Sequence, residues 1–191
     1  RGFLLTVFLF VVATASGQLL SWTPDFINET STPVEIVVDA TRGNQGLRDF
    51  ANTSDVYIHT GVITTSSTSA SDWRYVKFPN FNAPNAAAQC TYLGNNKWKF
   101  TIAGGLRNFY GVSSAGERIL KIAVLFRSGN GNTVQRNADG SDMYIPVYDN
   151  GFFARIEEPF RQPTFTPIPE PLNLSVGANI NIRTRATAAS S

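Results

Sequence analysis

The chain has 191 residues, 42% of them hydrophobic, and a formal net charge of +2 with no cluster of basic residues. It is long enough to bury one sizeable core, but it lacks the basic patch that attracts nucleic acids and anionic membranes. One histidine and one cysteine are too few for a closed zinc site. We therefore expect a globular domain that has no nucleic-acid partner and no cofactor.

The first residues have the features of an export signal. Arg1 precedes an apolar run from Phe3 to Ala13, and further small residues follow this run. The run is short for a membrane span, and the small residues suit cleavage before Gln18. These features predict a signal peptide over residues 1–17, truncated at its N-terminus, and a secreted, periplasmic or cell-surface protein. An uncleaved anchor is the alternative.

Residues 18–158 consist of short β-branched and aromatic runs separated by Gly, Asn and Pro, which is typical of an antiparallel β-sandwich. In chain order, strands are expected at 20–26, 34–40, 55–62, 73–78, 88–93, 97–102, 119–127 and 143–147. Pro24 predicts that the first strand lies at a sheet edge, because proline cannot donate to a strand ladder. The run at 119–127 is apolar at nearly every position, which predicts a central strand.

The same pattern predicts the turns and part of the interior. Residues 94–96 and 128–132 are rich in Gly and Asn and predict hairpin turns, whereas 108–112 predicts a turn or a short helical piece. Trp98 shares its strand parity with neighbouring apolar residues, so we expect it in the core. Cys90 is expected to be a small buried residue of a strand, because a single cysteine cannot form an internal disulfide.

The composition changes after residue 158. Proline and phenylalanine alternate with polar residues over 159–171, which predicts a stiff, extended linker. Residues 172–177 and 180–183 alternate apolar and polar side chains and predict two strands. Two strands are too few to fold alone, so we expect 172–191 to be the start of a second β-domain that continues in a longer exported protein.

Two neighbouring predicted strands contain the candidate site. In the first, Val56 and Ile58 share one parity, and Tyr57 and His59 share the other. If the aliphatic parity faces the core, the two polar rings point outward.

The second strand repeats this arrangement after a Ser/Thr-rich loop at 64–71, which is expected to be solvated and mobile. Val76 has the inward parity, whereas Trp73 and Tyr75 have the outward one. The sequence therefore predicts an outward platform of rings beside Asp72. The alternative is that the Trp73 ring folds over the edge of the core.

A platform of this kind suits a sugar. A pyranose has an apolar C–H patch surrounded by hydroxyls, so its binding site needs flat rings with polar partners nearby. The predicted carbohydrate-binding residues are Tyr57, His59, Asp72, Trp73 and Tyr75.

No catalytic arrangement is found in the sequence. His59 is not accompanied by a recognisable nucleophile motif. Glu157 and Glu158 are neighbours in an expected strand, so their side chains would point to opposite faces rather than together across a cleft. We therefore expect these residues to form no active site.

One oxygen-rich segment is a candidate for calcium binding. Asn137, Asp139 and Asp142 could supply oxygen ligands, but the segment lacks the spacing and the terminal Glu of an EF-hand loop. An Asx-rich turn around Gly140 is the simpler interpretation.

Several segments together resemble a known family. They are Asp55-Val56-Tyr57-Ile58-His59-Thr60-Gly61, Trp73, Lys97-Trp98-Lys99-Phe100, Ala123-Val124-Leu125-Phe126-Arg127 and Asn137-Ala138-Asp139-Gly140-Ser141-Asp142-Met143-Tyr144. These segments resemble the starch-binding modules of carbohydrate-binding families 25 and 26. Residues 19–171 as a whole, with the exit Phe-Thr-Pro-Ile-Pro-Glu-Pro, look like the N-terminal region of α-amylase family (glycoside hydrolase family 13) proteins of Bacteroidetes.

The resemblance implies an immunoglobulin-like sandwich that holds α-glucan while a downstream catalytic domain of the same chain hydrolyses it. His59 and Trp73 match positions of the sugar platform in those modules. The expected function is a non-catalytic α-glucan (starch)-binding or accessory module of a secreted amylase-like glycoside hydrolase. The alternative is an immunoglobulin-like spacer domain in a cell-surface or secreted multidomain protein, in which Trp73 would be buried or isolated.

Overall fold

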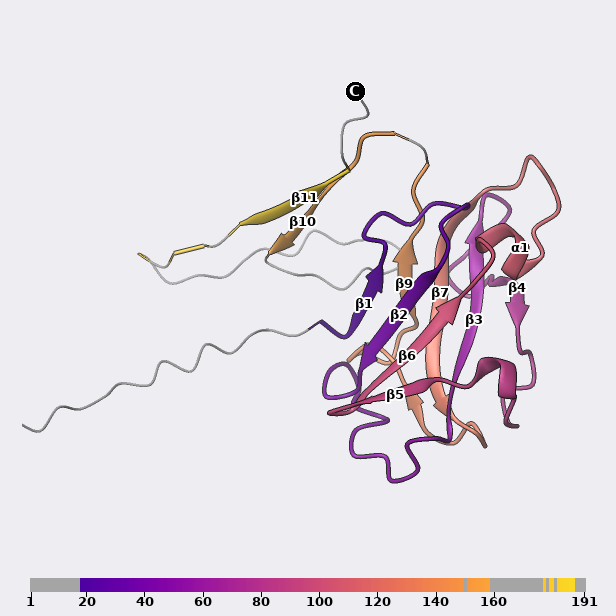
Figure 1. Ribbon diagram of the computed structural model, residues 1–191, viewed down its shortest axis with the longest axis vertical. Helices are drawn as coiled ribbons and strands as arrows, with labels where there is room; N and C mark the ends of the chain where they lie inside the picture. Colours follow the sequence, from indigo (N-terminus) through magenta and orange to yellow (C-terminus); the bar gives the residue numbers. More distant parts are fainter. Residues whose placement is uncertain (1–17, 150, 159–176, 178, 181, 188–191) are drawn as a thin grey trace, which may run out of the picture.

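The computed structural model describes residues 18–149, 151–158, 177, 179–180 and 182–187, and most of its regular structure is antiparallel β-strand (Figure 1). It confirms the prediction of an all-β sandwich. The predicted signal peptide at 1–17 and the predicted linker at 159–171 lie outside the described residues, as does nearly all of the strand predicted at 172–177.

The first sheet has four strands in the order β1-β2-β6-β5. Their bounds are β1 Leu20–Thr23, β2 Val34–Asp39, β5 Thr91–Gly94 and β6 Lys97–Ile102. β1 lies at the edge, as Pro24 predicted. The β5–β6 hairpin confirms the turn predicted at 94–96, where Asn95 and Asn96 adopt the positive φ angles of 50° and 60° that such a tight turn requires.

The second sheet has five strands, in the order β4-β3-β7-β8, with β9 also paired to β7. Their bounds are β3 Val56–Thr64, β4 Arg74–Lys77, β7 Ile119–Ser128, β8 Val134–Gln135 and β9 Met143–Pro146. Because β7 pairs with β3, β8 and β9, the long apolar run is central, as predicted. The short connections include the 3₁₀ turn η1 (Ala86–Ala88) and the helix α1 (Leu106–Tyr110), which confirms a helical piece near 108–112.

The main core lies between the two sheets. Alternate residues of each strand face it, and those with no exposed surface include Leu20, Val34, Ile36, Val38, Val56, Ile58, Val62, Trp98, Ile102, Ile122, Val124, Phe126, Met143 and Ile145. Trp98 is in the core as predicted, and its Nε1–H donates to the carbonyl of Thr53 over 2.9 Å. Cys90 is buried as predicted but precedes β5 instead of lying within a strand.

A separate two-stranded ribbon follows the sandwich strands. It consists of β10 (Ala154–Glu158) and β11 (Arg183–Ala186), which pair with each other rather than with either larger sheet. A strand was predicted at 180–183, but the observed strand β11 begins only at Arg183, the last residue of that range. Arg155 extends from the ribbon to Asp25 of the sandwich over 3.1 Å and lies over the rings of Trp22 and Phe26.

Candidate functional site

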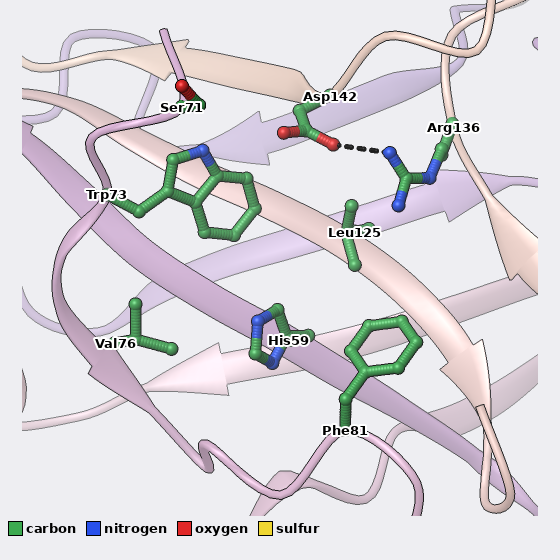
Figure 2. A pocket seen from close by; sticks show the side chains of 8 residues that line it. All are labelled: His59, Ser71, Trp73, Val76, Phe81, Leu125, Arg136 and Asp142. Carbon is green, nitrogen blue, oxygen red and sulfur yellow. Dashed lines mark hydrogen bonds and ion pairs between the residues drawn. The ribbon is translucent and has the colours of Figure 1, made fainter. Parts of the chain in front are cut away.

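A pocket of about 500 Å³ lies on the outer face of the second sheet, on the side away from the main core. His59 of β3 and Leu125 of β7 are directly paired across the sheet, and both point to this outer face because Ile58 and Phe126 beside them point inward with no exposed surface. Figure 2 shows the pocket and the side chains that line it, which are His59, Ser71, Trp73, Val76, Phe81, Leu125, Arg136 and Asp142.

Three rings form one part of the lining. The imidazole of His59 and the indole of Trp73 are stacked, with ring centroids 5.8 Å apart and planes inclined by 26°. Phe81 meets the same imidazole edge-to-face at 5.1 Å. The structure thus brings together the two residues on which the predicted sugar platform depended, and Trp73 is half-buried beside His59 rather than isolated.

A β-bulge brings Trp73 to this position. Thr60 pairs with Lys77, but Val62 pairs with Arg74, so β4 has one more residue than β3 between the two pairs. Tyr75 adopts a positive φ of 50° within this irregular stretch. The bulge packs closely over Gly61, where a Cβ atom would lie only 3.0 Å from the carbonyl oxygen of Arg74.

The bulge also overturns part of the parity prediction. Val76, predicted to face inward, lines the outer pocket with Trp73. Tyr75, predicted to join the platform, instead packs against the main core and donates its hydroxyl to Oε2 of Glu117 over 2.6 Å. The prediction was wrong for both residues because one extra residue in a strand reverses the alternation of the side chains that follow it.

Tyr57 is not part of an exposed platform either. It has the predicted outer-face parity, but only 7% of its surface is exposed. The guanidinium of Arg127 lies 5.5 Å from the centroid of the Tyr57 ring. The same guanidinium donates to the carbonyls of Asn80 and Ala83, in the segment after β4, over 3.1 and 3.0 Å. The predicted parity is therefore right, but the prediction of an exposed ring was wrong, because the guanidinium of Arg127 lies over the Tyr57 ring.

Asp72 contributes to the loop rather than to the pocket lining. Its Oδ2 accepts the backbone N–H of Thr68 over 3.0 Å, and its Oδ1 pairs with Nε of Arg74 over 3.0 Å. The hydrogen bond from Thr68, followed by the effects of Arg74, holds the pKa of this carboxyl below its usual value. Asp72 therefore stabilises the turn that leads into Trp73.

The Ser/Thr-rich loop is largely exposed, as predicted, although Thr64 is buried at the end of β3. Several hydrogen bonds define its path. Ser67 Oγ donates to the carbonyl of Asp72 over 2.9 Å, and Tyr144 Oη donates to the carbonyl of Ala70 over 2.9 Å. The Ser/Thr-rich loop therefore leads directly to the pocket, where Ser71 is part of the lining.

An ion pair forms the polar part of the pocket. Nη1 of Arg136 donates to Oδ1 of Asp142 over 2.8 Å (Figure 2). Burial raises the pKa of Asp142, and the positive charges of Arg136 and His59 partly offset that rise. Burial also lowers the pKa of His59, although a hydrogen bond with the backbone of Phe78 opposes the change. Burial therefore disfavours the charged forms of both Asp142 and His59, and Arg136 opposes this effect at Asp142.

Residues 136–142 form the Asx-rich turn that the sequence favoured over a calcium site. Asp139 accepts hydrogen bonds from both the backbone N–H and the hydroxyl of Ser141, and Gly140 has a positive φ of 80°. Asn137 Nδ2 donates to the carbonyl of Asp142 over 2.8 Å. Within the part of the chain that is described, no group of three His, Cys, Asp or Glu side chains could hold a metal ion.

Sequence reasoning missed Phe81, Arg136 and the role of Asp142 in this pocket. Phe81 lies in a Pro- and Asn-rich segment between strands, so no strand parity could place its ring. The sequence indicated Asp142 only as a possible oxygen ligand for calcium. A signal was nevertheless present, because an oppositely charged residue, Arg136, stands at the other end of the same predicted turn.

No protein-family model matches this sequence, and the comparison with curated proteins found no match. Among the helices of the described residues, none has the length and apolar character needed to span a membrane.

Proposed function

We propose that the pocket binds a glycan, specifically an α-glucan, and that the chain is a non-catalytic binding or accessory module of a secreted amylase-like glycoside hydrolase. The observation that carries this proposal is the stacked pair His59 and Trp73 beside the Arg136–Asp142 ion pair in one open pocket. Flat rings and fixed hydrogen-bonding groups within reach of one another are what a pyranose requires.

The choice of α-glucan depends on the resemblance to starch-binding modules, in which residues matching His59 and Trp73 form the platform. The Tyr57 and Tyr75 rings that the sequence added to this platform are replaced by Phe81, which is edge-to-face with His59. The proposed surface is thus built on the two residues that the resemblance implied, with a third ring supplied by the segment after β4.

The lining of the pocket also supports a binding rather than a hydrolytic role. Glycoside hydrolysis by the usual mechanism uses two carboxyl groups on either side of the scissile bond. Among the lining residues only Asp142 carries a carboxylate, and it is already paired with Arg136. A downstream catalytic domain would then supply the chemistry, as the resemblance implies.

Retention on insoluble starch granules tests the proposal with the whole 191-residue chain. The wild type should sediment with starch, and Trp73→Ala should remain in the supernatant because it removes one face of the stacked pair. Phe152→Ala is the matched control: it removes an aromatic ring that is 70% exposed and lies outside the pocket, so it should leave retention unchanged. A wild type that never sediments with starch would contradict α-glucan binding and favour the spacer interpretation.

A further inference from the structure

The Arg136–Asp142 pair is positioned rigidly at the ends of one turn. The backbone N–H of Asn137 donates to the carbonyl of Ser141 over 3.1 Å, and that of Gly140 donates to the carbonyl of Asn137 over 2.9 Å. The backbone N–H of Arg136 is held separately by the side chain of Asn44 over 2.9 Å. The two charged groups are therefore presented to the pocket by a turn whose backbone is fixed at both ends.

Each member of the pair keeps unused hydrogen-bonding capacity. The ion pair uses Nη1 of Arg136 and Oδ1 of Asp142. Nη2 of Arg136 and Oδ2 of Asp142 have no hydrogen-bond partner among the described residues. Neither atom is one of the fully buried polar atoms that lack a partner, so both keep access to the surface of the pocket. A guanidinium nitrogen only donates and a carboxylate oxygen only accepts, so the pair offers a free donor nitrogen on Arg136 and a free acceptor oxygen on Asp142.

We propose that Arg136 and Asp142 are the specificity-determining residues of this site and that together they bind a free vicinal diol of a neutral sugar. One hydroxyl donates to Oδ2 of Asp142, and its neighbour accepts from Nη2 of Arg136, while the ring face lies against Trp73 and His59. This inference rests on the proposed function, because it assigns the hydroxyl contacts of the same α-glucan pocket.

The chemistry of the pair explains why a neutral diol fits better than a charged ligand. A carboxylate ligand would be attracted by Arg136 but repelled by Asp142, and a cationic ligand would meet the reverse. Adjacent hydroxyls can donate to one group and accept from the other without breaking the ion pair. Hydrogen bonds to charged groups are also the stronger kind, which suits them to discriminate between ligands.

If the pair binds a vicinal diol, the site should select glucans by which hydroxyls of each glucose are left free by the glycosidic linkage and by substitution. An internal glucose of an α-1,4-glucan has a free pair of hydroxyls at carbons 2 and 3, whereas substitution at either carbon removes the pair. Soluble β-cyclodextrin presents this 2,3-diol on every ring. Methylation at oxygens 2 and 3 blocks the diol, while methylation at oxygen 6 leaves it free on the same scaffold.

Isothermal titration of the full-length wild type with these three ligands is the first test. β-Cyclodextrin and its 6-O-methyl derivative should bind with similar affinity, and the 2,3-di-O-methyl derivative should bind about tenfold or more weakly. Equal affinity for all three would overturn the diol proposal while leaving α-glucan binding intact. No binding of any of the three would instead overturn the proposed function and this inference with it.

A pair of variants provides the second test. Asp142→Asn replaces an acceptor-only carboxylate in the pocket and should lower the affinity for β-cyclodextrin about tenfold, with little further loss on 2,3-di-O-methylation. Asp139→Asn is the matched control, because that exposed carboxylate lies on the same turn but outside the pocket lining. Full discrimination against the 2,3-di-O-methyl ligand in Asp142→Asn would overturn the assignment of these hydroxyl contacts to the pair.

Discussion

The imidazole of His59 and the indole of Trp73 are stacked at 5.8 Å on the outer face of a β-sheet, although a polar loop separates them in the chain. Their meeting depends on the bulge between β3 and β4, which brings Trp73 and Val76 over the sheet while Tyr75 points elsewhere. A ligand platform is thus formed where strand alternation is interrupted.

Phe81 should contribute to glycan binding although it lies outside the regular strands. Its ring packs edge-to-face on His59, so Phe81→Ala is expected to weaken the binding of a soluble α-glucan by about 1 kcal/mol. Calorimetric titration measures this change. Phe81→Tyr keeps the ring and should retain most of the affinity; if it binds as weakly as Phe81→Ala, the ring contact is not what Phe81 supplies.

Arg127 should be a major contributor to the stability of this face. It has no exposed surface, and its two terminal nitrogens donate to four backbone carbonyls, which belong to Asn80, Ala83, Ser128 and Gly129. Arg127→Met leaves these buried acceptors without their donor and should lower the free energy of unfolding by about 3 kcal/mol or more. Urea denaturation measures the loss.

Two further variants test whether the geometry of that guanidinium matters. Arg127→Lys should recover little of the stability, because a lysine ammonium cannot reproduce the planar fork. Arg118→Met is the control: the Arg118 side chain is 53% exposed and pairs with Asp149 at the surface, so the loss should be below about 1 kcal/mol. Similar losses for Arg127→Met and Arg118→Met would contradict a structural role for the buried cation.

Gly43 should be essential for the position of Arg136. It has a φ of +63°, and a Cβ atom there would lie 2.1 Å from the carbonyl oxygen of Arg136. Gly43→Ala should therefore lower the free energy of unfolding by about 2 kcal/mol or more and also weaken glycan binding. Gly111→Ala is the control, since Gly111 has a similar φ of +78° but no atom within 4 Å of the added methyl. It should cost about 1 kcal/mol and leave binding unchanged.

The stability of the protein should fall as the pH drops below neutrality, partly because of His59. Burial holds the pKa of His59 in the folded protein below its ordinary value of 6.5. On acidification, His59 is protonated in the unfolded chain before it is protonated in the folded protein. Stability is therefore lost as the pH falls below about 6.5, and the loss ends once His59 is protonated in the folded protein too. One such group gives a slope of at most about 1.4 kcal/mol per pH unit.

Urea denaturation between about pH 5 and pH 7.5 measures this slope in the wild type and in His59→Gln. The variant should lose less stability over the same interval. The raised pKa of Asp142 acts in the opposite direction, because its folded form binds a proton before the unfolded chain does, and that effect is complete once the pH falls below its ordinary value of 3.8. Identical slopes in both proteins would show that His59 is not perturbed by folding.

The sequence by itself determined the β-class of the protein and most of its interior. Alternating apolar residues placed Trp98 in the core, Gly94-Asn95-Asn96 placed a hairpin turn, and the unbroken apolar run at 119–127 placed a central strand. These predictions succeed because side-chain parity, turn conformation and burial are local properties of a regular strand. His59 was found for the same reason, as a ring on the outward parity of β3.

Only the tertiary structure decided which groups share the pocket. One extra residue in β4 exchanged the roles of Val76 and Tyr75, and no composition rule predicts where a bulge falls. The carbonyl contacts of Arg127 decided that Tyr57 is covered and that Phe81 reaches His59. Contacts of this kind join segments far apart in the chain, so they depend on the packing of one element over another rather than on any local pattern.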